Sequence, residues 1–151
     1  MQDGTFPSPG HLQETTLPIN AKQVRVAAIS ARGDAFAADC PTRKLLDRIG
    51  DKWSVLILLL LGDADMRFSD LKRRIGGVSQ KMLTQTLRSL ERDGLVTRRV
   101  EATVPVTVTY GATPLARDLL AALRLMIDWA ETRMPEVATA QARYDARDAV
   151  K

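Results

Sequence analysis

Residues 66–110 read MRFSDLKRRIGGVSQKMLTQTLRSLERDGLVTRRVEATVPVTVTY, and this stretch decides the fold. Its first part predicts a short amphipathic helix, because Phe68, Leu71 and Ile75 fall on one face. Three basic residues turn to the opposite face: Lys72, Arg73 and Arg74. The Gly76–Gly77 pair then ends this helix in a tight turn.

A second helix follows, and Ser79 is well suited to cap its first turn. Its leucines recur at i, i+4 and i+7 and must point inward: Leu83, Leu87 and Leu90. The same spacing sends a polar set outward together: Gln80, Lys81, Thr84, Gln85 and Arg88. Gly94 fits the position just beyond the end of a helix.

Two β-rich runs follow Gly94. Residues 95–100 and 106–110 alternate with period two, and the residues between them, including Pro105, form a turn. Helix, tight turn, helix and basic hairpin together predict a mainly α fold with a small β-hairpin (α+β), a winged helix-turn-helix.

Composition predicts a soluble globular protein of one domain with tails. The 151 residues are 45% hydrophobic and 26% charged. The longest apolar run, residues 55–61, is too short to cross a bilayer. The first residues lack the basic start and apolar stretch of a secretion signal. The single cysteine fits a reducing compartment. We therefore expect a cytoplasmic protein with no membrane partner.

The positive charge of the chain is concentrated in one region. Residues 41–101 hold 13 basic and 8 acidic residues, whereas residues 1–40 hold 3 and 4, and residues 102–151 hold 6 of each. A basic excess over the predicted helix-turn-helix favours contact with phosphates. The alternative, a solvated helix face, would fit the charge alone but not its coincidence with this motif.

Residues 1–39 form a separate extension. Prolines and glycines with few apolar residues predict a mobile tail over the first 20 residues, and His11 has no metal partner there. Asn20 could cap a helix over 21–32, although a strand over 24–29 competes with it.

The ordered domain spans residues 40–134 and opens on Cys40–Pro41, a helix start. Leu45, Leu46 and Ile49 give this first helix a stripe that we expect to point inward, before Gly50. The next helix runs from residue 51 to 61, stops at Gly62 and is apolar all round, which predicts the central core helix. At its start Trp53 predicts a packing anchor, or alternatively the wall of a ligand pocket.

A long helix follows the hairpin, with Thr113 as its cap and Pro114 at its first position. This helix carries an apolar stripe about five turns long. A second set of residues widens the stripe: Leu120, Leu123, Ile127 and Ala130. This apolar surface predicts a homodimer whose interface includes the helix over 114–134 and these residues: Leu115, Leu119, Ala122, Leu123, Met126 and Trp129. A helix folded wholly against its own core is the alternative. Pro135 is expected to end it, with a weak helix in the tail, 135–151.

These segments also resemble a known family. Cys40–Pro41, LDRIGDKWSVLIL at 46–58, RFSDLKR at 67–73, VSQKMLTQ at 78–85 and LRSLERDGLV at 87–96 resemble HxlR-type transcriptional regulators, which are winged-helix proteins related to the MarR group. The resemblance covers about residues 40–134. It implies a dimeric bacterial DNA-binding regulator that responds to small reactive or ligand signals. The chain departs from the family in the hairpin turn at 102–106 and at 113–116, where the family usually has Thr-Glu-Leu-Gly.

The polar face of the second helix has the chemistry to read base edges in the major groove of double-stranded DNA. Gln80 and Gln85 can pair with adenine, Lys81 or Arg88 can donate to guanine, and Thr84 can bond a base or meet a thymine methyl. The remaining candidates are assigned to phosphates or the minor groove: Ser79, Lys72, Arg73, Arg74, Arg98 and Arg99. A solvated surface role is the alternative for each one.

Cys40 stands at a helix N-terminus, where the dipole favours a thiolate, although Asp39 opposes it. The family resemblance implies a sensor of oxidants or electrophiles at this position. Without a second cysteine the chemistry is alkylation, a mixed disulfide or a bond between two subunits. An inert thiol is the alternative.

The sequence bears on three functional classes. A homodimeric repressor on a short inverted repeat is favoured, because a bound dimer can block polymerase. It could instead respond to a ligand bound near Trp53 and Trp129, with Cys40 inert. The second class is a winged-helix module that binds protein. An enzyme is rejected, because the sequence offers no nucleophile–base pair, phosphate loop or metal-ligand cluster, and no cofactor is expected. The sequence does not specify the operator, the target genes or the inducer.

Overall fold

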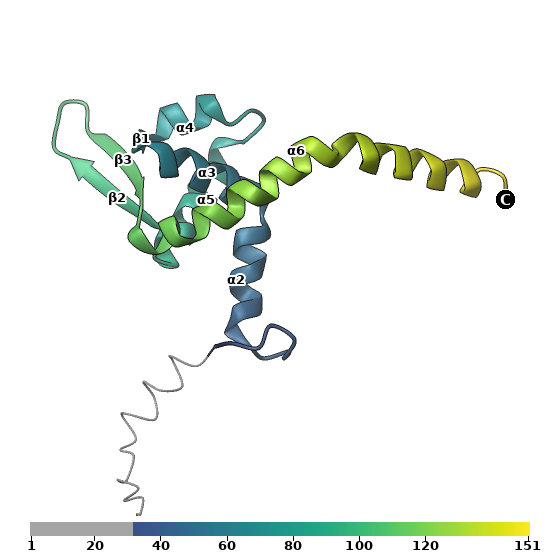
Figure 1. Cartoon of the computed structure of the whole chain (residues 1–151). Helices are drawn as coiled ribbons and strands as arrows, with labels where there is room; N and C mark the ends of the chain where they lie inside the picture. Colours follow the sequence, from purple (N-terminus) through teal and green to yellow (C-terminus); the bar gives the residue numbers. More distant parts are fainter. Residues whose placement is uncertain (1–31) are drawn as a thin grey trace, which may run out of the picture. The chain divides into compact units, whose positions relative to one another are not determined.

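The computed structural model describes residues 32–151, and residues 35–151 form one compact unit (Figure 1). The expected tail, helix or strand before residue 32 and His11 lie outside the described residues. The helices are α2 (Pro41–Gly50), α3 (Lys52–Asp63), α4 (Phe68–Arg74), α5 (Gln80–Arg92) and α6 (Pro114–Asp148). The strands are β1 (Met66–Arg67), β2 (Val96–Glu101) and β3 (Thr107–Ala112). The predicted winged helix-turn-helix fold is confirmed.

Helix α3 is the centre of the core. It begins where the Asp51 side chain accepts a hydrogen bond from the Ser54 backbone N–H at 3.0 Å. Ile57, Leu58 and Leu61 are fully buried within it. Trp53 packs against the core only in part, with the Lys52 ammonium 4.5 Å from its ring centroid. The predicted role of α3 is therefore confirmed.

The helix-turn-helix is formed by α4 and α5. The Ser79 hydroxyl accepts from the Met82 N–H at 3.0 Å, as a capping residue should. Beyond the other end of α5, Gly94 has φ 74° and lets the chain turn back. The N–H of Leu95 then bonds to the carbonyl of Leu90 at 2.9 Å. Both ends of α5 are thus fixed by the residues that the sequence indicated.

The sheet has three strands in the order β1-β3-β2, all antiparallel. The hairpin of β2 and β3 was predicted from the sequence, but β1 was not. Strand β1 pairs Met66 with Tyr110 and Arg67 with Thr109. Two residues are too short to show the alternation that identifies a strand, so only the tertiary pairing defines it.

The first half of α6 packs on α3 through a stripe formed by Ala116, Leu120 and Leu123. The helices approach closely at Gly62, where a Cβ atom would lie 2.5 Å from the Leu120 Cδ1 atom. Leu123 is 4% exposed, so its assignment to a dimer interface is wrong, because the core of its own chain already covers it. The second set of apolar residues on this helix, Leu120, Leu123, Ile127 and Ala130, thus faces mainly the core of its own chain.

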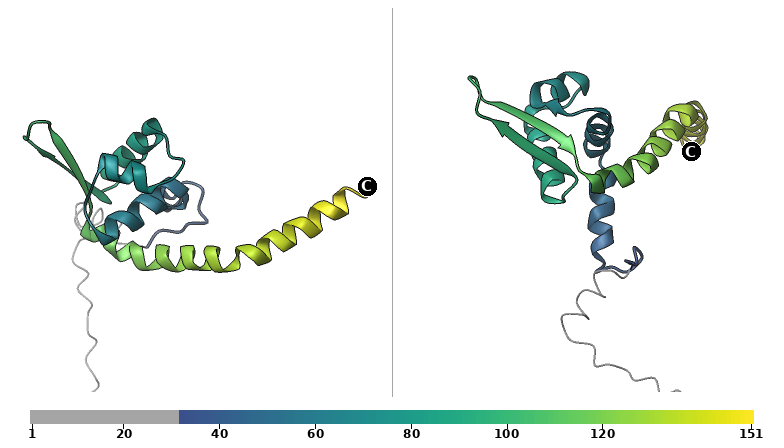
Figure 2. Two further views of the ribbon diagram at one scale, coloured as in Figure 1. Left: turned by 90° about the horizontal axis from the view of Figure 1, so that it is seen from above. Right: turned by 60° about the vertical axis from the view of Figure 1, so that its left-hand side comes forward.

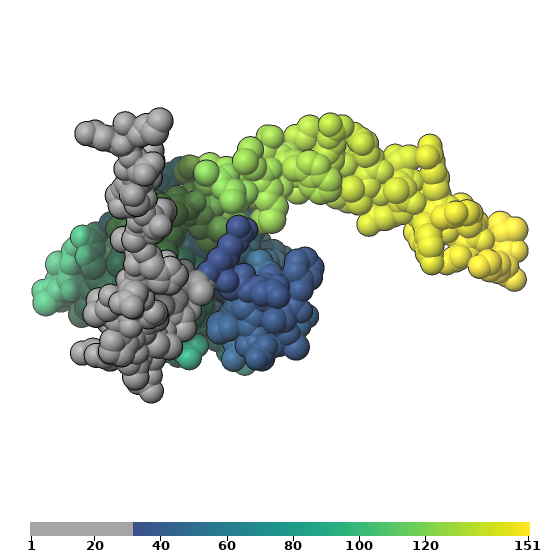
Figure 3. Space-filling view, turned by 60° about the horizontal axis from the view of Figure 1, so that its bottom comes forward, coloured from purple at the N-terminus to yellow at the C-terminus, as the bar shows by residue number. Residues whose placement is uncertain are grey.

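Pro135 does not end α6, which continues to Asp148. The prolyl nitrogen lacks the N–H that would bond to the carbonyl of residue 131, and its ring disfavours a straight helix there. The helix changes direction along its length instead of stopping (Figure 2). Good helix formers on both sides offset the cost of the proline, about 3 kcal/mol. The C-terminal half, yellow in Figure 3, extends beyond the rest of residues 35–151.

The apolar stripe of α2 does not point inward as predicted. Leu45 and Leu46 are 46% and 48% exposed, and no residue of α2 is fully buried. Helix α2 packs on α3, and its Arg48 Nε atom lies 2.8 Å from the Asp93 Oδ2 atom at the end of α5. These contacts fix the helix but leave its leucines uncovered within residues 32–151. None of the described helices is both long and apolar enough to cross a membrane.

Candidate nucleic-acid interface

The polar face of α5 is open to solvent. Gln80, Lys81, Gln85 and Arg88 are exposed, while the leucines of the other face are buried in the core. Thr84 is half-buried, and its hydroxyl donates to the Gln80 carbonyl at 2.8 Å. Its proton is therefore engaged, which leaves a lone pair and the methyl group for a ligand. The structure brings this predicted set together on one face, and their contacts with DNA stay predictions.

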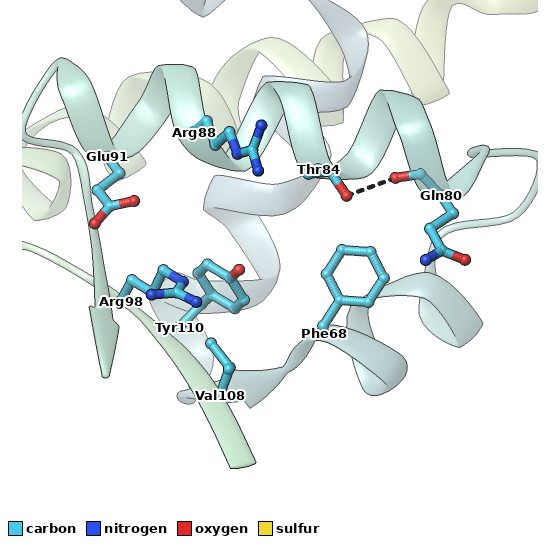
Figure 4. Close-up of a pocket in the computed structure, with 8 residues that line it drawn as sticks. All are labelled: Phe68, Gln80, Thr84, Arg88, Glu91, Arg98, Val108 and Tyr110. Atoms are coloured by element: carbon cyan, nitrogen blue, oxygen red, sulfur yellow. Dashed lines mark hydrogen bonds between the residues drawn. The ribbon is translucent and has the colours of Figure 1, made fainter. Parts of the chain in front are cut away.

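A groove of about 540 Å³ separates α5 from the sheet (Figure 4). One wall is helical and the other comes from the hairpin, with Arg88 and Arg98 on opposite sides. The floor carries apolar and aromatic side chains. The full lining is Phe68, Gln80, Thr84, Arg88, Glu91, Arg98, Val108 and Tyr110. Within residues 32–151 neither arginine forms a salt bridge, so the groove presents two available guanidinium groups.

Strand alternation separates the two arginines of β2. Arg98 pairs across the strands with Tyr110 and faces the groove, whereas Arg99 pairs with Thr109 and lies on the other face of the sheet. There the Arg99 guanidinium lies 2.8 Å from the Asp65 carboxylate. From the sequence, both were predicted to contact phosphates or the minor groove. The geometry favours Arg98 for that role, because the charge of Arg99 is already opposed by a carboxylate.

The basic residues of α4 are also not equivalent. Arg73 pairs with Asp70 one turn earlier. The Lys72 ammonium lies 3.4 Å from the Val78 carbonyl and supports the turn between the helices. Arg74 is exposed and forms no salt bridge within residues 32–151. Lys72 and Arg74 therefore remain candidates for phosphate contact, and Arg73 is the weakest of the three.

Sequence reasoning did not include Phe68, Glu91, Val108 and Tyr110 as residues of this groove. Glu91 lies eleven residues after Gln80, on the same side of α5, so helical spacing could have indicated it. The other three were expected only as core or strand residues. They line the groove because the sheet folds back toward α5, which spacing along the chain does not reveal.

The remaining candidates lie away from the groove. Cys40 is the residue before α2 and is half-buried, with a backbone N–H that donates to the Ala37 carbonyl at 3.2 Å. Along α6, Leu115, Met126 and Trp129 are exposed at 60%, 45% and 61%. Ala122 is exposed too, while Leu119 is half-buried against the core. Apart from Leu123, the predicted interface residues thus have at least part of their surface uncovered.

A capped recognition helix, a preceding short helix and a hairpin beside a basic groove define a winged helix-turn-helix protein of the DNA-binding type. The family model described as HxlR-like helix-turn-helix matches residues 48–138. The chain belongs to this family of HTH-type transcriptional regulators, which are not enzymes.

Individual relatives agree with the family assignment. The chain is 43% identical over 115 residues to an HTH-type transcriptional regulator, YtfH, of Escherichia coli strain K12, covering 76% of this chain and 91% of the relative. A solved structure of the putative transcriptional regulator ytfH from Salmonella typhimurium superposes with a TM-score of 0.70 at 41% identity, covering 74% and 99% of the two chains. The redox regulator HypR in its oxidised form has a TM-score of 0.58 at 38% identity, covering 62% and 96%.

Proposed function

We propose that the protein is a homodimeric, sequence-specific repressor that works in the cytoplasm and binds a short inverted repeat in duplex DNA. One observation carries this proposal: the exposed polar face of α5 stands across a groove from Arg98 of the wing. A helix fits the major groove, and a hairpin beside it can reach the adjacent minor groove. The strand of phosphates between the two grooves would then pass over Arg88 and Arg98.

In this proposal the α5 side chains divide the work of recognition. Gln85 and Lys81 are exposed on α5 outside the lining of the groove, and they read adenine and guanine edges. Thr84, with its proton engaged, meets a thymine methyl group. Arg88 serves a guanine or the neighbouring phosphate. Ser79, whose hydroxyl is used as the cap, contributes through the backbone N–H groups at the helix N-terminus.

The dimer is proposed to form through α6 and the uncovered leucines of α2. Large apolar side chains remain exposed on α6, among them Leu125 at 72% and Trp129 at 61%. A contiguous apolar surface of this kind on one chain favours burial against a second copy. In a two-fold assembly the two α5 helices would lie about 34 Å apart, one turn of DNA, which requires an inverted repeat.

Footprinting on the DNA that flanks the protein's own gene tests the proposal. The expected result is a protected inverted repeat, with affinity that falls steeply as salt rises. Random duplex of the same length and base composition is the control. Equal binding to both DNAs at every salt concentration would contradict the proposal and favour the alternative, a winged-helix module that recognises protein.

Arg88→Ala and Arg98→Ala are expected to weaken DNA binding in different ways. Arg88→Ala should cost about 1–3 kcal/mol on the operator and relax base preference at one position. Arg98→Ala should weaken operator and random DNA alike and reduce the slope of log affinity against log salt by about 1. Fluorescence anisotropy over a salt series measures both effects. Arg99→Ala is the matched control, since its guanidinium is paired with Asp65, and it should change the slope least.

We also propose that Cys40 makes DNA binding sensitive to oxidants. Its support is its half-buried position at the start of α2 and the similarity to HypR, a redox regulator. Oxidation would join Cys40 to a small thiol or to Cys40 of the partner subunit, with two electrons passing to the oxidant. Either product changes the start of α2, which is tied through Arg48 to the end of α5.

Cys40→Ser is expected to abolish the response to diamide. In the unchanged protein diamide should shift operator affinity several-fold, and dithiothreitol should restore it. Non-reducing electrophoresis separates a disulfide between subunits from a mixed disulfide. An equal diamide response in both proteins would instead indicate an inert thiol and favour a ligand as the inducer.

A further inference from the structure

Among residues 32–151, Glu91 is the one acidic residue that lines the groove between α5 and the sheet. It lies one helical turn after Arg88, on the side of α5 that also carries Gln80 and Thr84 (Figure 4). Within the described part of the chain its side chain forms neither a salt bridge nor a hydrogen bond. Both carboxylate oxygens are therefore available as acceptors.

The lack of a partner distinguishes Glu91 from the aspartates around it. Three of these have cationic partners: Asp65 with Arg99, Asp70 with Arg73 and Asp93 with Arg48. Glu91 has none, although two unpaired guanidinium groups, those of Arg88 and Arg98, line the same groove. The groove thus presents an acceptor beside two donors, an arrangement complementary to a ligand that offers both acceptors and a donor.

A DNA phosphate is not a suitable partner for the Glu91 carboxylate. Two negative groups at contact distance repel each other, whereas an ionised carboxylate accepts hydrogen bonds. In the major groove the donors are amino groups on base edges, and carboxylates pair there with the N4 amino group of cytosine. Glu91 is therefore suited to a base edge and not to the DNA backbone.

Arg88 and Glu91 have the spacing to address one base pair. Three residues advance a helix by about 4.5 Å, close to one base-pair step of about 3.4 Å. A G·C pair presents the two guanine acceptors, N7 and O6, followed by the cytosine N4 donor, whereas an A·T pair places its donor between two acceptors. A guanidinium and a carboxylate one turn apart on α5 match the G·C pattern.

We propose that Arg88 and Glu91 together read one G·C pair in each operator half-site, with Arg88 donating to guanine and Glu91 accepting from the cytosine amino group. This inference rests on the proposed DNA binding by α5 and goes further, because it adds Glu91 to the recognition residues and specifies the partner of Arg88. Arg98 is left for the phosphates. On DNA without this base pair the carboxylate has no donor and only opposes the phosphates, so Glu91 also lowers non-specific affinity.

The experiment uses the full chain with Glu91→Ala, and the exposed position keeps the folding cost small. Glu91→Gln removes the charge but keeps the shape and one acceptor. Glu131→Ala, at an exposed glutamate of α6, is the matched control, because it removes the same charge away from α5. These proteins and Arg88→Ala are titrated by fluorescence anisotropy with random duplex, with the footprinted operator, and with operators in which each base pair of the half-site is replaced in turn.

The expected result for Glu91→Ala is an operator affinity lower by roughly tenfold and a random-duplex affinity higher by roughly twofold. Glu91→Gln should show the same gain on random duplex and a smaller loss on the operator, because an acceptor remains. Base preference should relax at the same G·C pair in Glu91→Ala and in Arg88→Ala. Glu131→Ala should match the unchanged protein on every DNA.

Full base preference in Glu91→Ala, or relaxation at a pair other than the one that responds to Arg88→Ala, would overturn the inference and leave DNA binding by α5 intact. Equal tightening of Glu91→Ala on operator and random duplex would also overturn it, because the carboxylate would then only oppose phosphates. Failure of the unchanged protein to prefer its operator over random duplex would overturn the proposed function and this inference with it.

Discussion

Trp129→Glu is expected to give a monomer whose operator affinity is lower by about 100-fold or more. Trp129 is 61% exposed on α6 and belongs, with Met126, to the predicted dimer interface. In the proposed dimer a carboxylate would replace an apolar ring at the interface, and the cost of burying that charge would oppose association. Once the subunits separate, each α5 helix binds one half-site alone and the gain from linking two sites is lost.

Sedimentation equilibrium measures the association, and anisotropy measures the affinity. Trp129→Phe is the matched control, because it keeps a large aromatic side chain, and it should stay dimeric. Half-site DNA provides a second comparison: the monomeric variant and the unchanged protein should bind it with similar affinity. A Trp129→Glu protein that still sediments as a dimer would place the interface elsewhere.

The fold could be predicted from the sequence where local signals and burial agree. Leu83, Leu87 and Leu90 define the inward face of α5, and Ser79 and Gly94 mark its two ends. Each of these signals is satisfied within a few residues of the chain. The short helix α4 and the hairpin were predicted for the same reason.

The sequence was misleading where the answer depends on a distant segment. Leu45 of α2 and Leu123 of α6 both fall in apolar stripes, yet the first is half-exposed and the second is buried. Periodicity identifies an apolar face but does not say what covers it. Gly62 lets Leu120 of α6 approach α3 closely, since a Cβ atom at this position would lie 2.5 Å from the Leu120 Cδ1 atom. Pro135 shows that a local signal can also be overridden.

In the candidate site, too, the features set by local spacing could be predicted, and those set by distant segments could not. The exposed set on α5 follows from helical spacing, and its arrangement on one face was foreseen. The unequal roles of Arg98 and Arg99 were not, although alternation along a strand separates neighbours. What distinguishes them is Asp65, which precedes β1 and meets Arg99 across the sheet. That pairing depends on a two-residue strand, Met66–Arg67, that the sequence pattern does not reveal.

Leu87→Ala is expected to lower the free energy of unfolding by about 2–5 kcal/mol. Leu87 is 1% exposed and lies on the inward face of α5. Its truncation therefore leaves a cavity between this helix and the rest of the domain. A domain of ordinary stability has about 5–15 kcal/mol in total, so the variant should unfold at clearly lower urea concentration. Urea denaturation followed by circular dichroism measures the shift.

Gln85→Ala is the matched control on the same helix. Gln85 is exposed, so this change should alter stability by no more than about 0.5 kcal/mol while weakening operator binding. Leu87→Ala should do the reverse: at temperatures where it is folded, its base preference should match that of the unchanged protein. Loss of base preference in a folded Leu87→Ala protein would mean that the inner face of α5 takes part in recognition. If Leu87→Ala lowers stability alone and Gln85→Ala lowers operator binding alone, the two faces of α5 have separate roles. The leucines then hold the helix in place, and the polar side chains contact the DNA.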